Sequence, residues 1–276
     1  MCLITWSWQP HSHTPLLLLS NRDEFYARPA QALHWWDHAS NGAEVLAGKD
    51  LQAGGTWLGV SRSGRLAALT NYRTPEPAHA NTSSRGELVA NFLQDHTTAE
   101  SFLNQLAPQA DDYNPFNLLV FDGQSLMGLE SRGPRIIAMK PGIGAVSNAN
   151  FQTPWPKLTR LTRGLASKIE QGKSNTSDLL SLLHDRQIAA DADLPETGIA
   201  LDLERMLSAT FITSPAYGTR ACSVVAIHSD HSKFTEQVFD AEGLLGQIHY
   251  HFATVNRATR SSLPALPDCP GVQDSL

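Results

Sequence analysis

The sequence is poor in the residues that mark several classes of protein. It has only three cysteines in 276 residues, and Cys2, Cys222 and Cys269 lie far apart. An odd number of widely separated cysteines argues against a disulfide framework and favours a reducing compartment. No apolar run approaches the roughly 18 residues that cross a bilayer, and the first residues lack the basic and apolar regions of a signal peptide. These absences predict a soluble, cytoplasmic protein without a transmembrane segment.

Charge is also sparse. Charged residues make up 17% of the chain, the net charge is -6, and no long run of Lys or Arg occurs. Nucleic acid and basic membrane-binding patches are therefore not expected. Internal repeats and low-complexity linkers are absent as well, so we expect one domain over residues 1–260. The proline-containing residues 261–276 are expected to form a loose tail.

Alternating and periodic apolar residues predict a mixture of strands and helices. Helical periodicity covers 155–171 and 177–185, and capping-box spacing at Ser84/Glu87 and Thr97/Glu100 predicts two further helices. Short apolar runs predict strands at residues 2–8, 16–20, 56–60, 66–71, 116–121, 126–130, 221–228, 234–239 and 249–255. Two antiparallel sheets covered by helices, or one large sheet with helices on both faces, would satisfy this order.

Cys2 directly follows Met1 at the start of the first predicted strand. Removal of Met1 would place a thiol and a free α-amine on one residue, and an α-amine has a pKa of roughly 7.7–8.0. Such an amine can take the thiol proton and return it to a leaving group, so no histidine is required. The alternative is a small buried strand residue behind a retained Met1.

Three charged residues, Arg22, Asp23 and Glu24, follow the second predicted strand. They could form a solvated surface turn. If the first two strands pair as a hairpin, however, Arg22 lies near Cys2, where a guanidinium lowers a thiol pKa and can bind a carboxylate.

Two asparagines follow extended runs, Asn71 and Asn148. Side-chain amides can donate hydrogen bonds to the oxyanion of a tetrahedral intermediate, and either residue could instead belong to a turn. The pair Gly54-Gly55 could let a substrate approach the backbone or could form a turn before a core Trp57. The histidine pairs 11/13, 228/231 and 249/251 lack a nearby Cys or carboxylate that completes a metal site, so we expect no metal.

Six segments occur in a fixed order through residues 1–256: MCLI, SNRDEFYARPA, GGTWLGVSRSGRLAALTNYR, PFNLLVFDG, SNANFQTPWPK and YGTRACSVV. In these segments the chain resembles the NRDE family, named for the tetrapeptide Asn21-Arg22-Asp23-Glu24. The animal transport and Golgi organisation protein 2 belongs to that family.

The NRDE family is in turn distantly similar to the N-terminal nucleophile hydrolases of the penicillin V acylase and bile salt hydrolase type. This resemblance implies an α+β fold, a four-layer αββα sandwich of two antiparallel sheets. It also implies a site made of Cys2, Arg22, Asp23, Asn71, Asn148 and Arg220. The acylases separate the Arg from the Asp by two residues, whereas here they are adjacent, so Glu24 is an alternative acid. Asn150 likewise competes with Asn148.

The resemblance implies hydrolysis or acyl transfer at an amide or thioester bond of a small-molecule acyl substrate, with no cofactor. The alternative is a non-catalytic protein on the same scaffold that binds haem, acyl-CoA or lipid, because family members are implicated in haem trafficking and Golgi organisation. Haem would need an axial ligand, for which Cys2, His34 and His249 are candidates. Trp35-Trp36, between His34 and His38, would suit a flat ligand or form a surface or core aromatic pair.

Overall fold

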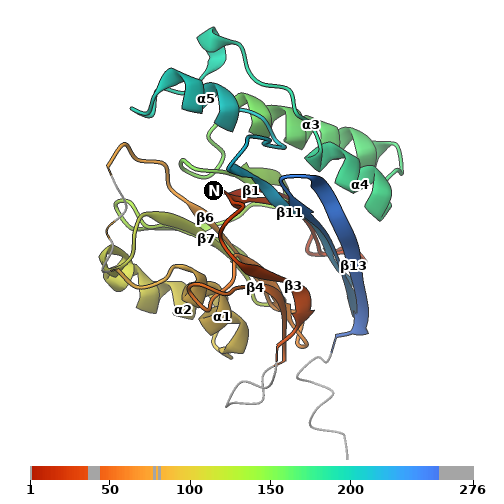
Figure 1. Ribbon diagram of the computed structural model, residues 1–276. Helices are drawn as coiled ribbons and strands as arrows, with labels where there is room; N and C mark the ends of the chain where they lie inside the picture. The colour runs from red at the N-terminus through yellow and green to blue at the C-terminus, as the bar shows by residue number, and fades with distance from the viewer. Residues whose placement is uncertain (1, 37–43, 77–78, 80–81, 255–276) are drawn as a thin grey trace, which may run out of the picture.

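The computed structural model describes residues 2–36, 44–76, 79 and 82–254. Within them the chain forms two antiparallel sheets packed face to face, with helices on the outer faces (Figure 1). The predicted tail, residues 261–276, lies outside the described residues.

One sheet has six strands in the order β10-β1-β2-β11-β12-β13. The predicted N-terminal hairpin is formed by β1 and β2, and β2 also pairs with β11 from the other end of the chain. Segments from both ends therefore meet in the middle of this sheet. Its strands are β1 (Cys2–Trp8), β2 (Leu16–Phe25), β10 (Gly142–Val146), β11 (Tyr217–Ile227), β12 (His231–Asp240) and β13 (Gly243–Ala253).

The other sheet has seven strands that follow one another in chain order, β3 to β9. The hairpins predicted between residues 56–71 and 116–130 are both formed in it. Its strands are β3 (Ala30–Trp35), β4 (Val45–Asp50), β5 (Leu58–Ser61), β6 (Leu66–Asn71), β7 (Phe116–Phe121), β8 (Leu126–Glu130) and β9 (Arg135–Ala138).

Helices cover the outer face of each sheet (Figure 1). The seven-stranded sheet carries α1 (Gly86–Gln94) and α2 (Ala99–Leu106), and the six-stranded sheet carries α3 (Pro156–Glu170) and α4 (Thr176–Leu183). A short helix, α5 (Leu201–Leu207), lies between α4 and β11 in the chain. Two 3₁₀ segments complete the set, Ala107–Asp112 and Asp191–Asp193.

Strand alternation divides the apolar residues into three cores, because successive side chains of a strand point to opposite faces. In β1, Ile4 and Trp6 belong to the core between the sheets, whereas Leu3 packs under α3 and α4. A third core lies between the seven-stranded sheet and α1 and α2. The order of layers is helix, sheet, sheet, helix, so the expected four-layer α+β sandwich is confirmed.

The second strand is longer than the sequence suggested. The prediction ended it at residue 20 with a charged turn behind it, but β2 continues to Phe25 and Arg22 and Asp23 are buried. The solvated-turn alternative is wrong because β2 is a central strand. Its continuation pairs with β11 as far as Tyr217, and this pairing keeps the charged residues in the sheet.

Both predicted capping boxes are also wrong. The Glu87 carboxylate accepts a hydrogen bond from the Tyr113 hydroxyl (2.8 Å), and α1 begins behind Arg85 with no side-chain cap. At α2 the cap is Thr98, one residue later than expected, and its hydroxyl accepts from the Ser101 amide. The hydroxyl of Thr97 is instead bonded to the side chain of the preceding Asp95 (2.9 Å).

Candidate functional site

The thiol-bearing Cys2 is the first residue of β1, and its direct cross-strand neighbour in β2 is Arg22. Directly paired residues share a face of the sheet, so both side chains point into the layer between the sheets. Cys2 is 8% exposed. Burial raises the pKa of the Cys2 thiol, and the nearby Arg22 cation acts in the opposite direction. The hairpin thus brings together the two residues that the sequence paired.

Arg22 reaches across to the seven-stranded sheet. Its Nη2 lies 3.0 Å from Asp50 Oδ2 in β4, and its guanidinium stacks 4.2 Å from the ring centroid of Trp57. Arg28 binds the same Asp50 oxygen at 2.6 Å. Burial alone would raise the pKa of Asp50, but Arg28 and Arg22 hold it below its ordinary value. Arg22 is therefore fixed beside Cys2 by contacts with the opposite sheet.

Asp23 occupies the other face of β2, under the helices. Its Oδ1 accepts a hydrogen bond of 2.7 Å from the Thr219 hydroxyl in β11, and its backbone carbonyl accepts one of 3.0 Å from the Tyr217 hydroxyl. Burial raises the pKa of Asp23, and the neighbouring Lys157 cation opposes that shift.

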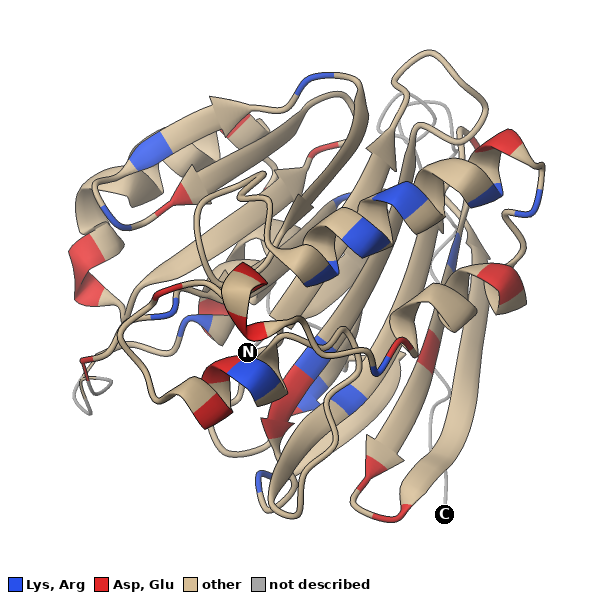
Figure 2. Cartoon of the chain, turned by 90° about the horizontal axis from the view of Figure 1, so that it is seen from above, with Lys and Arg blue, Asp and Glu red and all other residues tan. Residues whose placement is uncertain are grey.

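The other candidate acid, Glu24, returns to the face that Arg22 occupies. It is half-buried, and its Oε2 lies 3.8 Å from Arg28 Nε. Asp23 and Glu24 thus lie on opposite faces of β2, and their surroundings differ. Asp23 is buried with hydroxyl donors, whereas Glu24 belongs to an arginine-rich edge. Viewed from above, acidic and basic segments lie side by side on the strands near the start of β1 (Figure 2).

The two asparagines are in contact with each other. Asn148 Nδ2 donates to the backbone carbonyl of Asn71, which ends β6, at 2.8 Å. Ser147 Oγ lies 3.1 Å from Asn148 Oδ1 and 3.2 Å from the backbone carbonyl of Cys2. The Asn71 side chain has no hydrogen-bond partner among the described residues, so Asn71 is the side-chain amide left to donate. Asn148 is 1% exposed and links the end of β10 to β6, whereas its rival Asn150 lies in the following turn.

Arg220 stands at a β-bulge, where the pairing of β11 with β2 shifts register. Its Nη1 donates to the backbone carbonyls of Phe25, Tyr26 and Arg28, and its Nε donates to that of Phe239. These bonds hold the turn that follows β2. The bulge thus directs this arginine to backbone carbonyls at the end of the Arg22 strand.

Three cations that contact residues of the site, or lie close to them, were not among the candidates. Lys157, in the first turn of α3, is 2% exposed and donates to the Leu207 carbonyl at 2.9 Å. Burial lowers the pKa of Lys157 to about 8, and the charges of Asp23 and Cys2 oppose the shift. A lysine in the first turn of a helix opposes the helix dipole. This unfavourable placement is the feature of the sequence that could have identified Lys157 as a candidate.

The other two cations are Arg73 and Arg85. Arg73 is buried, pairs with Glu204 of α5 at 2.5 Å and stacks 4.8 Å from the ring centroid of Trp155. Arg85 precedes α1 and donates to the Pro115 carbonyl at 3.1 Å. Burial lowers its pKa, and the charge of Cys2 opposes that effect. Neither arginine carried a local signal, because each approaches the site through tertiary packing.

Two of the haem candidates, His34 and His249, each make an ordinary hydrogen bond through one ring nitrogen. His34 Nδ1 lies 2.8 Å from the Ala32 carbonyl, and His249 Nδ1 lies 2.7 Å from the Thr235 hydroxyl. Trp35 packs edge-on against Phe252, as a core aromatic would. His38 lies outside the described residues. Within the described ranges no group of three or more His, Cys, Asp or Glu could hold a metal ion, and no helix has the length and apolar character of a membrane span.

The glycines before Trp57 have a packing role. Gly54 adopts a φ of +79°, and a Cβ on Gly55 would lie 2.4 Å from the backbone of Gly86 at the start of α1. The Thr56 amide donates to the Gly86 carbonyl at 3.1 Å. These contacts support the alternative of a tight turn before a core tryptophan.

The profile of the family described as Transport and Golgi organisation 2 matches residues 1–241. The chain belongs to this family. The Transport and Golgi organization protein 2 homolog of Bos taurus is 36% identical over 263 residues, which cover 86% of this chain and 92% of that protein. The Homo sapiens homolog is 34% identical over 259 residues, with the same shares covered.

Among solved structures, the fold is similar to that of a mutant of conjugated bile acid hydrolase from Clostridium perfringens. The TM-score is 0.52 at 10% sequence identity, with 91% of this chain and 96% of that chain covered. At this identity the likeness concerns the fold alone. It agrees with the N-terminal nucleophile hydrolase architecture that the sequence motifs implied.

Proposed function

We propose that this member of the Transport and Golgi organisation 2 family is an N-terminal cysteine hydrolase or acyltransferase for an amide or thioester bond. The observation that carries the proposal is the direct pairing of Cys2 with Arg22 on the inter-sheet face, in a fold shared with a bile acid hydrolase. Once Met1 is removed, the amine and thiol of Cys2 form a complete nucleophile and base.

In the proposed reaction the Cys2 amine takes the thiol proton, and the sulfur attacks the carbonyl carbon of the substrate. The tetrahedral intermediate places its negative oxygen before the Asn71 amide, which is held by Asn148. Collapse breaks the carbon–nitrogen or carbon–sulfur bond, and the ammonium of Cys2 returns its proton to the leaving group. Water, or an acyl acceptor, then attacks the acyl thioester and regenerates the thiol.

The charged residues have distinct roles in this proposal. Arg22 stabilises the thiolate against the burial that raises the pKa of Cys2, and it attracts an acidic group of the substrate. Arg220 is a positioning residue that holds the end of the Arg22 strand. Asp23 is buried next to Lys157, which favours it as the acid over Glu24.

The test begins with the intact mass of the purified full-length chain. We expect the mass to lack Met1, since a retained Met1 leaves no free amine on Cys2. Acyl anilides and acyl thioesters are then screened for turnover with wild type, Cys2→Ala and Cys222→Ala. Cys222 is a buried cysteine of the same sheet on the opposite face, which makes it a matched control.

Cys2→Ala is expected to lower turnover at least about a thousandfold, because the covalent route is lost. Cys222→Ala is expected to keep it. Hydrolysis that is unchanged in Cys2→Ala would exclude Cys2 as the nucleophile. A haem titration of the same proteins covers the carrier alternative. A Soret shift that persists in Cys2→Ala and is lost in His34→Ala or His249→Ala would favour haem carriage.

A further inference from the structure

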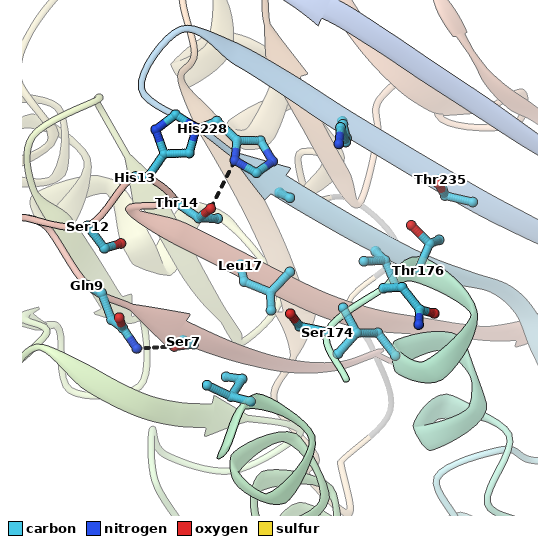
Figure 3. Close-up of a pocket in the computed structure, with 16 residues that line it drawn as sticks. Ser7, Gln9, Ser12, His13, Thr14, Leu17, Ser174, Thr176, His228 and Thr235 are labelled. Atoms are coloured by element: carbon cyan, nitrogen blue, oxygen red, sulfur yellow. Dashed lines mark hydrogen bonds between the residues drawn. The ribbon is translucent and has the colours of Figure 1, made fainter. Parts of the chain in front are cut away.

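A cavity of about 520 Å³ lies at the end of the six-stranded sheet remote from Cys2 (Figure 3). It lies between the helix-facing side of the sheet and the connection from α3 to α4. In the close-up, Leu17 lies in the middle, with His13 and His228 on one side and Ser174 and Thr176 on the other. Its size falls within the range of roughly 300–1,000 Å³ that is typical of small-molecule sites.

The cavity exists because the sheet extends beyond its helical cover. Helix α3 ends at Glu170 and α4 begins at Thr176, so this end of the face is covered by the connecting residues 171–175 and by the adjoining ends of the two helices. Beneath them one cross-strand row runs over four strands, through Ser7, Leu17, Ala226 and Lys233. Neighbouring strands lie about 4.8 Å apart, so this row spans roughly 14 Å.

The row of strand residues forms the floor of the cavity, and small side chains in it leave room for a ligand. Ala226 lies on β11, between two paired strands, yet it is only half-buried because the cavity exposes it. Apolar side chains surround it, and hydroxyl and amide groups form the rest of the wall. The apolar set is Leu17, Ile169, Leu179 and Val224, and the polar set is Ser7, Gln9, Ser12, Thr14, Ser174, Asn175, Thr176 and Thr235. The cavity is thus amphipathic.

In the part of the chain that the structure describes, the charged side chains that line the cavity include a positive group and no negative group. Lys233 is the only Lys, Arg, Asp or Glu among the described lining residues, and none of the ion pairs formed by described residues includes it. Lys233 is half-buried, and its ammonium gives the cavity a positive charge to which an anionic group of a ligand can bind. His228 adds no negative charge. Burial, with His231 and Lys233 nearby, lowers its pKa to about 4, so it is neutral at pH 7 and shares a 2.9 Å hydrogen bond with Thr14.

We propose that this cavity binds a small organic monoanion, a carboxylate with a short apolar chain. The carboxylate pairs with Lys233, and the chain lies along the floor of Ala226, Val224 and Leu17. The site is separate from the one that contains Cys2. Ser7 and Cys2 are five positions apart on β1 and on opposite faces of the sheet, so the inference does not depend on the proposed hydrolase activity.

The test is calorimetric titration of the full chain with sodium octanoate. We expect one site in wild type and an affinity at least tenfold weaker in Lys233→Met, which keeps the length of the side chain and removes its charge. The matched control is Lys49→Met, because Lys49 is also a half-buried strand lysine and lies in the other sheet. Equal octanoate affinity in wild type and Lys233→Met would overturn the proposal.

Three further measurements do not depend on the Lys233 variant. Octanamide, the neutral analogue, should bind wild type at least tenfold more weakly than octanoate. Ala226→Leu should abolish binding by filling the floor. Wild type with its Cys2 thiol alkylated should still bind, whereas loss of binding on alkylation would place octanoate at the Cys2 site and overturn the assignment. Absence of octanoate binding to folded wild type at millimolar concentration also overturns it.

Discussion

Cys2 and Arg22 are direct neighbours across two strands, and the cation acts on the thiol in the layer between the sheets. Asp23, one residue further on, points to the helices instead. The alternation of the strand therefore places Arg22 and Asp23 on opposite faces of the sheet. Burial and the Asp23 charge raise the pKa of the Cys2 thiol, and the Arg22 cation opposes them from the same face as the thiol.

At this scale we predict that Arg22→Met raises the pKa of the Cys2 thiol. Its alkylation at neutral pH should slow by about tenfold for each unit of pKa. Asp50 keeps Arg28 as a partner in the variant, so the local fold should be retained. The measurement is the pH dependence of the iodoacetamide rate at Cys2. Arg62→Met, which removes a cation stacked on Trp35, is the control. An unchanged alkylation profile would contradict an electrostatic role for Arg22.

Among the helices and strands, α5 packs against the rest of the protein through only a few buried side chains. Two of its leucines, Leu201 and Leu203, are 49% and 46% exposed. Its contacts with the interior come from Leu207 and from the buried pair of Glu204 with Arg73, in which Thr197 also donates to Glu204. The Leu207 carbonyl accepts from Lys157 near Cys2, so this short helix connects the β6 end and α3 around the site.

We expect Glu204→Ala to release α5, because removing one partner of a buried ion pair costs about 3–5 kcal/mol. Amide hydrogen exchange in residues 201–207 should accelerate by about a hundredfold or more. Asp202→Ala is the control from the same helix, since Asp202 pairs with Arg205 while 91% exposed, and exposed pairs contribute little. Similar exchange in both variants would show that the buried pair does not fasten the helix.

For the whole molecule, the contact between the two sheets includes a buried carboxyl group. Glu236 of β12 accepts a hydrogen bond of 2.8 Å from the Leu33 amide of β3, in the opposite sheet. Burial raises the pKa of Glu236 from 4.5 to about 7. Between these values the folded protein holds a proton that the unfolded chain releases, so the free energy of unfolding falls as pH rises through this window.

Glu236→Gln should remove this pH dependence, because the amide oxygen still accepts from Leu33 and no longer titrates. Relative to the variant, wild type should lose up to about 1.4 kcal/mol per pH unit between pH 4.5 and 7. Urea unfolding at several pH values measures the difference, with the exposed Glu242→Gln as the control. Parallel curves for wild type and Glu236→Gln would refute the buried-acid account.

Local patterns in the sequence determined much of the architecture. Apolar alternation marked the N-terminal hairpin and the two central hairpins of the seven-stranded sheet, whereas the four layers were implied by the family resemblance and not by periodicity. Arg22 was placed beside Cys2 because a hairpin relates residues that are close in the chain. These features depend on interactions over a few residues, which periodicity records.

Tertiary structure decided the rest. The pairing of β2 with β11 extended β2 to Phe25 and buried Asp23, and packing of α3 brought Lys157 to the same place. The cavity under residues 171–175 depends on where two helices end relative to a sheet drawn from both ends of the chain. Whether a charged residue is buried depends on segments that are distant in the chain and pack against it. Such long-range contacts produce no periodic pattern in the sequence, so the sequence alone did not predict them.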